Sequence, residues 1–186
     1  MTPMELLGEF YDTDSRLFQI LVAHSRLVAE KALQVARNVN HLNPDLEFIR
    51  EASMLHDIGV YQTKAPKIGC HGPYPYIMHG YLGGEVLRER GLHRHALVCE
   101  RHPGAGISKE MILSHGLDLP ARDMRPQSIE EKIICYADKF YSKTPDAFHV
   151  EKRVPEIIRM LASYGEEQAE TFKSWVILFS EKTDDS

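Results

Sequence analysis

The chain has 186 residues, which is long enough for one domain with a full hydrophobic core. Hydrophobic residues make up 43% and charged residues 26%, and the formal net charge of −5 excludes a global basic field that would attract nucleic acid. The three cysteines have no disulfide spacing, the N-terminus lacks signal-peptide features, and no run of about 18 apolar residues is present. We therefore expect a cytoplasmic protein with no membrane span.

Helical periodicity begins near the N-terminus. The first predicted helix spans about residues 14–38, with Asp14 as its N-cap and His24 on its apolar face. A second spans about residues 43–59 and places His56 on its apolar face. Both helices therefore present an imidazole toward the expected core.

The next segment, residues 60–77, shows no periodicity and contains Pro66, Gly69, Gly72, Pro73 and Pro75. It is predicted to be a long loop, and loops of this length in compact domains are usually functional or disordered. Two interpretations stay open. The loop either covers a functional site or only connects two helices.

Helical patterns return after this loop. A third helix is predicted over about residues 77–90 and carries His79 on its apolar face, and a fourth over about 93–102 ends at His102. A short helix then follows Ser108 and ends at His115-Gly116.

The last part of the chain is also helical in pattern. Ser128-Ile129-Glu130-Glu131 predicts a capping box, and the helix that it opens carries Ile134, Asp138 and Tyr141 on one face. Further helices are predicted over about 153–164 and 166–180. The fold class is therefore predicted to be all-α, a single-domain helical bundle over residues 1–186 with a core of about 14–145 and C-terminal helices of about 150–180 packing on it.

Six side chains on or at the ends of these apolar stripes can bind metal: His24, His56, Asp57, His79, His102 and Asp138. A lone histidine on an apolar face is more often a hydrogen-bonded core residue than a ligand, but here several helices each supply one. Lys139 does not readily explain Asp138, since adjacent helical residues diverge by about 100°. Imidazole and carboxylate donors together suit Fe, Mn, Ni, Co or Zn. We expect the other histidines at the surface: His41, His71, His93, His95, His115 and His149.

The order of the first His, the His56-Asp57 doublet and the distal Asp resembles the HD-domain superfamily of metal-dependent phosphohydrolases. The doublet continues as His-Asp-Ile-Gly, a common form of the motif, and the resemblance covers about residues 20–145. His79 and His102 match the additional histidines of the binuclear branch. The stretch from Arg101 to Lys143 is similar to a small stand-alone prokaryotic subfamily, from which the long 60–77 loop departs.

This resemblance implies a central metal site with one or two divalent transition-metal ions. His24, His56, Asp57 and Asp138 would hold one ion, and Asp57 would bridge to a second ion held by His79 and His102. The implied activity is hydrolysis of a phosphoric ester or anhydride through a metal-activated hydroxide shared by the ions. The expected substrate is a nucleotide or another small phosphorylated metabolite.

Several cations are candidates for the phosphate. Lys139 and Arg101, beside two ligands, join Asp57 as candidate catalytic residues, while Lys64 and Lys67 are candidate substrate-binding residues in the 60–77 loop. Each of the four is also compatible with a solvated surface cation.

The run Gly104-Ala105-Gly106 could present backbone N–H groups to an anion, which makes Gly104 and Gly106 candidate substrate-binding residues. A simple turn between helices would have the same sequence.

Two other classes of function stay open at this stage. Some binuclear relatives with the same ligand order are di-iron oxygenases, and a metal-bound HD protein without catalysis is the third class. The chain is expected to bind a small phosphorylated substrate rather than a nucleic-acid polymer or a membrane, and its oligomeric state, including a homodimer, is open.

Overall fold

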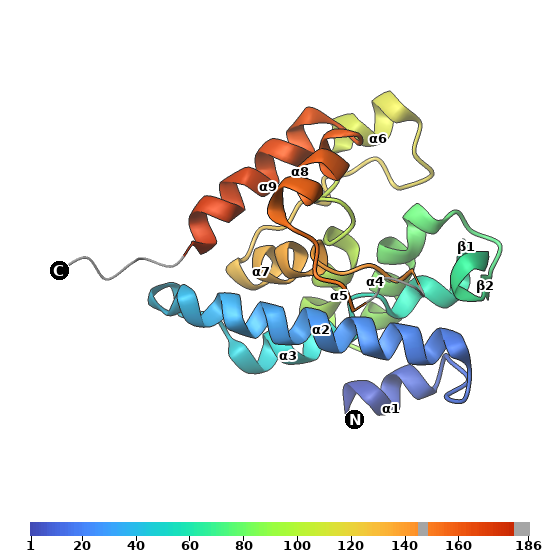
Figure 1. The fold of residues 1–186 in the computed structure, drawn as a ribbon. Coiled ribbons are helices and arrows are strands. Elements are labelled where there is room, and N and C mark those ends of the chain that lie inside the picture. Colours follow the sequence, from blue (N-terminus) through green and yellow to red (C-terminus); the bar gives the residue numbers. More distant parts are fainter. Residues whose placement is uncertain (145–148, 181–186) are drawn as a thin grey trace.

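The structure is a computed structural model that describes residues 1–144 and 149–180. The fold class is all-α, as predicted: α-helices dominate, and the two strands have two residues each (Figure 1). The helices are α1 (Pro3–Gly8), α2 (Arg16–Asn38), α3 (Leu46–Leu55), α4 (His79–Glu89), α5 (His93–Arg101), α6 (Lys109–His115), α7 (Ile129–Asp138), α8 (Val154–Ala162) and α9 (Glu166–Phe179), and the strands are β1 (Lys64–Ala65) and β2 (Cys70–His71).

The long helix α2 organises the fold, and α3 and α7 pack against it. Its N-cap is Ser15 rather than the predicted Asp14, because the Ser15 side chain accepts a hydrogen bond from the Phe18 amide. The short helix α1 was not predicted. It is closed by a capping box between Thr2 and Glu5.

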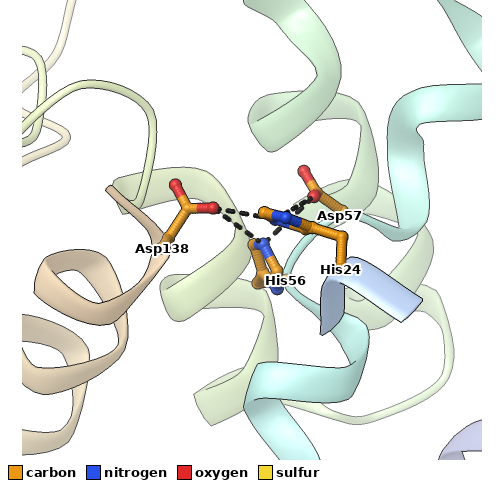
Figure 2. A group of neighbouring side chains, drawn as sticks. All are labelled: His24, His56, Asp57 and Asp138. Carbon is orange, nitrogen blue, oxygen red and sulfur yellow. Dashed lines mark hydrogen bonds and ion pairs between the residues drawn. The ribbon is translucent and has the colours of Figure 1, made fainter. Parts of the chain in front are cut away.

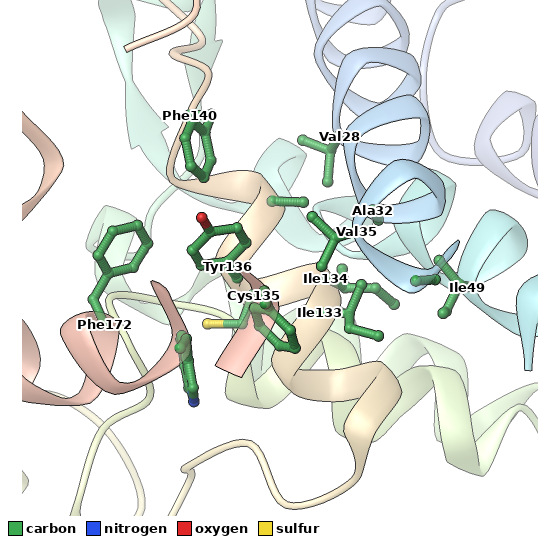
Figure 3. Close-up of a cluster of buried hydrophobic side chains, with 14 of the residues drawn as sticks. Val28, Ala32, Val35, Ile49, Ile133, Ile134, Cys135, Tyr136, Phe140 and Phe172 are labelled. Atoms are coloured by element: carbon green, nitrogen blue, oxygen red, sulfur yellow. The ribbon is translucent and has the colours of Figure 1, made fainter. Parts of the chain in front are cut away.

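The larger hydrophobic cluster lies where α2, α3, α7 and α9 meet (Figure 3). Val28 and Ala32 of α2, Ile49 of α3 and Ile134 of α7 are all fully buried in it. Phe172 of α9 is also fully buried and stacks on Tyr136 of α7, with ring centroids 5.0 Å apart. This cluster fixes α7, and therefore Asp138 at its end, relative to α2.

Helix α7 begins at the predicted Ser128, whose side chain accepts a hydrogen bond from the Glu131 amide. The predicted capping box is only half formed, because the Glu131 carboxylate accepts from the Gln127 amide instead of the Ser128 amide. The helix ends at Asp138, so Tyr141 lies beyond it rather than on its face as predicted.

The segment between α3 and α4 is more ordered than the predicted loop. It folds into 3₁₀ turns at Ile58–Gln62, Pro66–Ile68 and Tyr76–Met78 around the antiparallel pair β1–β2, in which Lys64 pairs with His71. The proline and glycine residues lie at the boundaries of these short elements: Pro66 begins the second turn, Gly69 follows it, and Pro75 precedes the third.

One glycine allows the first of these turns to pack closely on α4. A Cβ atom at Gly59 would lie 2.3 Å from both the Gly83 amide nitrogen and the His79 carbonyl oxygen. Only a residue without a side chain permits this approach. The Ile58–Gln62 turn, which directly follows Asp57, is thereby held against the helix that carries His79.

Helix α9 supports the turn after α5. The Gln168 side chain accepts a hydrogen bond from the Ala105 amide and donates one to the Gly106 carbonyl oxygen. The buried face of α9 thus fixes the turn that follows His102. Within the described residues, no helix combines the length and the apolar character needed to cross a membrane.

Candidate metal centre

The six candidate ligands converge on one buried site. His24 lies within α2, His56 caps the end of α3 and Asp57 follows it, while His79 begins α4. His102 caps the end of α5, and Asp138 is the last residue of α7. Five of the six therefore lie at or next to helix ends that meet beside α2.

The first group of ligands consists of His24, His56, Asp57 and Asp138, whose side chains point toward one another (Figure 2). The His24 Nε2 atom lies 2.9 Å from Asp138 Oδ1 and 3.4 Å from Asp57 Oδ2. The His56 Nε2 atom lies 3.0 Å from Asp57 Oδ2 and 3.4 Å from Asp138 Oδ1. Two imidazoles and two carboxylates thus present four donor atoms to one point.

The second group shares Asp57 with the first. The Nε2 atoms of His79 and His102 each lie 3.4 Å from Asp57 Oδ1 and are 3.0 Å from each other. One oxygen of the carboxylate therefore faces each pair of histidines. This is the arrangement that a carboxylate bridging two ions requires.

The rings are held in the orientation that metal binding needs. The Nδ1 atoms of His56, His79 and His102 lie 2.6–2.7 Å from the backbone carbonyl oxygens three residues earlier. Because a carbonyl can only accept, each Nδ1 carries a proton, so that in the neutral form of each ring the lone pair is on Nε2. The Nδ1 atom of His24 is buried and has no such partner within the described residues.

Electrostatics within the site also favour a bound cation. Burial would raise the pKa of Asp57, but the His56 and Lys143 cations more than offset it and lower that pKa well below its usual value. Burial would lower the pKa of His56, but the carboxylates of Asp57 and Asp138 raise it to about 9. When no metal is present, a protonated His56 therefore supplies the positive charge between the two carboxylates.

The other three histidines of the site, His24, His79 and His102, have lowered pKa values and stay neutral. Burial lowers the pKa of His24 to about 4, and burial together with the neighbouring His102 lowers that of His79 to about 3. Neutral imidazoles are the form that binds metal. Within the described residues the buried atoms His56 Nε2 and Asp57 Oδ1 lack a hydrogen bond of good geometry, as expected for donors that a metal would satisfy. The site therefore fits one or two transition-metal ions.

Two lysine side chains lie against these carboxylates. The Lys139 Nζ atom lies 2.5 Å from Asp138 Oδ2 and 3.0 Å from the His102 carbonyl oxygen. The expectation that adjacent residues diverge is wrong here, because α7 ends at Asp138 and the long Lys139 side chain folds back. The Lys143 Nζ atom lies 2.7 Å from Asp57 Oδ2.

An open cavity of about 760 Å³ leads to the site. His79, His102, Asp138, Lys139 and Lys143 form part of its lining. Most of the remaining wall is apolar, and it includes Ala65, Ile68, Tyr76 and Ile77 of the 60–77 segment as well as residues around α6 and α8. The 60–77 segment therefore lines the cavity and does more than connect two helices. A small molecule entering this cavity would meet the second group of ligands and both lysines.

A family model described as HD domain matches residues 21–142, which span the whole ligand set from His24 to Asp138. The chain belongs to the HD-domain family. The match confirms the resemblance that the His-Asp doublet and the distal Asp indicate.

Relatives of this HD protein share about two thirds of its length. An uncharacterized protein of Methanocaldococcus jannaschii is 40% identical over 121 residues, which cover 63% of this chain and 64% of the relative. Two proteins named tRNA (cytidine(56)-2'-O)-methyltransferase, from Thermoplasma volcanium and Picrophilus torridus, are 31% and 32% identical over 66% of this chain but only 32% of their own length. The chain thus spans less than two thirds of each of these relatives. No solved structure matches the chain.

The HD cavity contains only some of the candidate phosphate cations. Lys139 and the exposed Lys67 line it, whereas Lys64 is exposed and lies outside the lining. Arg101 also lies outside it, because its guanidinium binds the Glu131 carboxylate at 2.9 Å. The structure therefore brings Arg101 to the start of α7 rather than to the metal ligands.

The turn Gly104-Ala105-Gly106 has a structural role, and two of its three backbone amides are not available to an anion. The Ala105 amide donates to Gln168 and the Gly106 amide donates to the Pro103 carbonyl oxygen, so neither is free for an anion. Gly104 lines the cavity, and Gly106 does not. Both have positive φ, and a Cβ at Gly104 would lie 2.3 Å from Gln168 Oε1, so the turn needs glycine for its contact with α9.

Sequence reasoning missed some residues of the site. Lys143 and Lys152 both line the cavity, but neither belongs to a helix or a recognisable motif. His115 lines the cavity as well, although it is exposed as expected. His95 is not a surface residue: its ring packs edge-on against Phe48 and its side chain is only 12% exposed.

Proposed function

We propose that this HD protein is a metal-dependent hydrolase of phosphoric esters or anhydrides. One observation carries the proposal: Asp57 directs one carboxylate oxygen to each of two buried histidine pairs, in a site that faces a cavity lined with lysines. Such a centre is suited to holding two ions beside a phosphoryl group.

The chain's own groups have distinct parts in this proposal. His24, His56, Asp57 and Asp138 would hold one ion, and His79 and His102 would hold a second through Asp57. When bound, the ions supply Lewis acidity, which lowers the pKa of a coordinated water molecule and offsets charge on phosphoryl oxygens.

The second group offers three protein donors, fewer than the four of the first group. Sites with three protein ligands keep positions open for water and substrate, whereas closed sites are usually structural. His79 and His102 line the cavity, so the open side of the centre faces the space where a substrate would bind.

In the proposed reaction, a water oxygen forms a bond to phosphorus while the bond from phosphorus to the leaving oxygen breaks, and that oxygen takes up a proton. Lys139 is held by Asp138 and the His102 carbonyl, so its ammonium is fixed beside the ligands. It would stabilise negative charge that develops on the phosphoryl oxygens.

The size of the cavity supports a small metabolite as substrate. About 760 Å³ lies within the range of sites for nucleotides and other small molecules and is far larger than a phosphate group alone. The activity named for the two methyltransferase relatives is not assigned to this chain, because the match covers only 32% of each. Their names justify including tRNA among the substrates tested.

The test is phosphate release by protein freed of metal with a chelator and reloaded with Mn²⁺, Co²⁺, Ni²⁺, Zn²⁺ or Fe²⁺. Nucleotides, sugar phosphates and tRNA would be screened with wild type, Asp57→Ala and the control His41→Ala, which changes an exposed histidine that belongs to neither ligand group. We expect release by wild type and the control but not by Asp57→Ala.

The alternative classes give different results in the same assay. Absence of phosphate release with every metal, together with oxygen consumption by the iron-loaded protein, would favour an HD-type oxygenase. Full metal loading with neither activity would favour a non-catalytic metal-binding protein.

A further inference from the structure

Three lysine ammonium groups gather on the cavity side of the metal centre. Lys139 binds Asp138, Lys143 binds Asp57, and the Lys152 Nζ atom lies 3.4 Å from the Lys139 carbonyl oxygen. All three line the cavity, and we call them the lysine cluster. The backbone also joins them, because the Lys152 amide donates to the Phe140 carbonyl oxygen at 2.8 Å.

The charges around the cluster are unequal. Asp138 is the only acidic residue that lines the cavity within the described part of the chain, whereas the lysine cluster and Lys67 contribute four cations. This excess is notable in a protein whose net charge is −5. A cavity lined by one sign of charge concentrates ligands of the opposite sign.

Within residues 1–144 and 149–180, Lys152 is the member of the lysine cluster whose charge is not balanced by a carboxylate. Its ammonium is partly buried and forms no ion pair with a carboxylate in the residues that the structure describes. A long cationic side chain turned into a cavity without a carboxylate partner is a candidate to bind an anionic ligand.

Lys143 has a partner that a metal would also use. Its ammonium lies on Asp57 Oδ2, the oxygen that also faces His24 and His56. A divalent ion bound by this group would repel the ammonium and compete for the same oxygen. Lys143 would then be available to the cavity, where its side chain already forms part of the wall.

From this arrangement we infer that the lysine cluster selects a doubly charged terminal phosphate, so that the substrate class is a phosphomonoester or a terminal anhydride phosphate rather than a phosphodiester. The inference rests on the proposed function and narrows it. A diester carries one negative charge and two organic groups on phosphorus, whereas a terminal phosphate exposes more oxygens and more charge to Lys143 and Lys152. The cluster would bind these oxygens with charge-assisted hydrogen bonds.

The test compares 4-nitrophenyl phosphate, a monoester, with bis(4-nitrophenyl) phosphate, a diester, using metal-loaded wild type, Lys152→Met, Lys152→Arg and Lys143→Met. Lys109→Met is the matched control, because Lys109 is exposed on α6 and lies outside the cavity lining. Metal content and melting temperature verify that each variant is folded and loaded. A second readout is the Kd of inorganic phosphate, measured by calorimetry without any turnover.

We expect Lys152→Met and Lys143→Met to lower kcat/KM for the monoester, and to weaken phosphate binding, by about tenfold each, the usual cost of one charge-assisted hydrogen bond. Lys152→Arg should recover most of the loss, and Lys109→Met should change nothing. The diester should be a poor substrate whose kcat/KM changes little. Lys143→Met should bind metal at least as tightly as wild type, because no ammonium then competes for Asp57.

Two results would overturn the inference and leave the hydrolase proposal standing. One is a diester cleaved as well as the monoester, and the other is unchanged monoester kinetics in Lys152→Met. If neither ester is cleaved, the proposed function fails for these substrates, and the Kd of inorganic phosphate alone tests the role of the lysine cluster. Equal Kd values for Lys152→Met and Lys109→Met would then refute phosphate binding by the cluster.

Discussion

In the metal-free centre, His56 on one side and His24 and His79 on the other make the stability of the folded protein respond to pH in opposite directions. The carboxylates around His56 raise its pKa from 6.5 to about 9. Between these two pH values the folded protein keeps a proton on His56 that the unfolded chain has lost. Stability should therefore be lost as the pH rises from 6.5 to about 9. Burial lowers the pKa of His24 to about 4 and that of His79 to about 3, so stability should also be lost as the pH falls below 6.5.

The metal-free protein is thus expected to be most stable near pH 6.5, with a slope on either side of up to about 1.4 kcal/mol per pH unit for each proton. Urea unfolding in the presence of a chelator from pH 5 to 9 measures this. His56→Gln should remove the decline above pH 6.5, and bound metal should reverse it, because metal binding displaces the proton. A wild-type stability that stays constant above pH 6.5 would contradict the assigned charge of His56.

At the scale of elements, a close contact holds the turn after Asp57 against α4, the helix that carries His79. Gly59→Ala would place a methyl group 2.3 Å from two backbone atoms of α4, which cannot move independently of His79. We expect the free energy of unfolding to fall by about 1–3 kcal/mol and the affinity of the second ion to fall with it. Chemical unfolding and metal titration measure the two effects.

Gly8→Ala is the control for this change. A Cβ at Gly8 would make an ordinary contact of 3.7 Å with the Thr13 side chain, and the backbone there has no positive φ. This variant should be neutral or slightly more stable, because alanine restricts the unfolded chain. Equal losses in the two variants would mean that the close approach of the turn to α4 has no special role.

The helices could be predicted from sequence because their apolar stripes have helical spacing and several begin at clear caps, such as Ser108 and Ser128. The ligand set could be identified because His24, His56 and Asp138 lie on such stripes. The interior of the 60–77 segment could not, since its two-residue strands carry no periodicity.

The lysine cluster shows a second limit. Lys143 and Lys152 lie outside helices, and their proximity to Asp57 and Lys139 depends on how the chain continues after α7. Local spacing contains no information on such contacts. Arg101 illustrates the reverse case: it is adjacent to His102 in sequence, but its side chain leaves the site to bind Glu131.

At the scale of the whole molecule, α9 belongs to the same hydrophobic cluster as α2 and α7. Phe172→Ala would empty a fully buried position that stacks on Tyr136, two residues before Asp138, and should cost about 3–5 kcal/mol. The loss should appear in one cooperative unfolding transition, and metal should shift that same transition. The control Ile177→Ala, at a position 78% exposed on the same helix, should stay within about 0.5 kcal/mol of wild type.

Two separate transitions, with Phe172→Ala affecting only one of them, would show that α9 unfolds independently of the metal-binding helices. A single transition would instead support the prediction that the C-terminal helices and the ligand-bearing core form one domain.

We infer that one carboxylate, Asp57, joins two metal sites in a single buried centre. Titration of the metal-free protein with Mn²⁺ or Co²⁺, with bound ions counted per chain, tests it most directly. We expect two ions in wild type and in the control His41→Ala, one in His79→Ala, and neither at comparable affinity in Asp57→Ala. Two tightly bound ions in Asp57→Ala, or the same count in His79→Ala as in wild type, would contradict the shared centre.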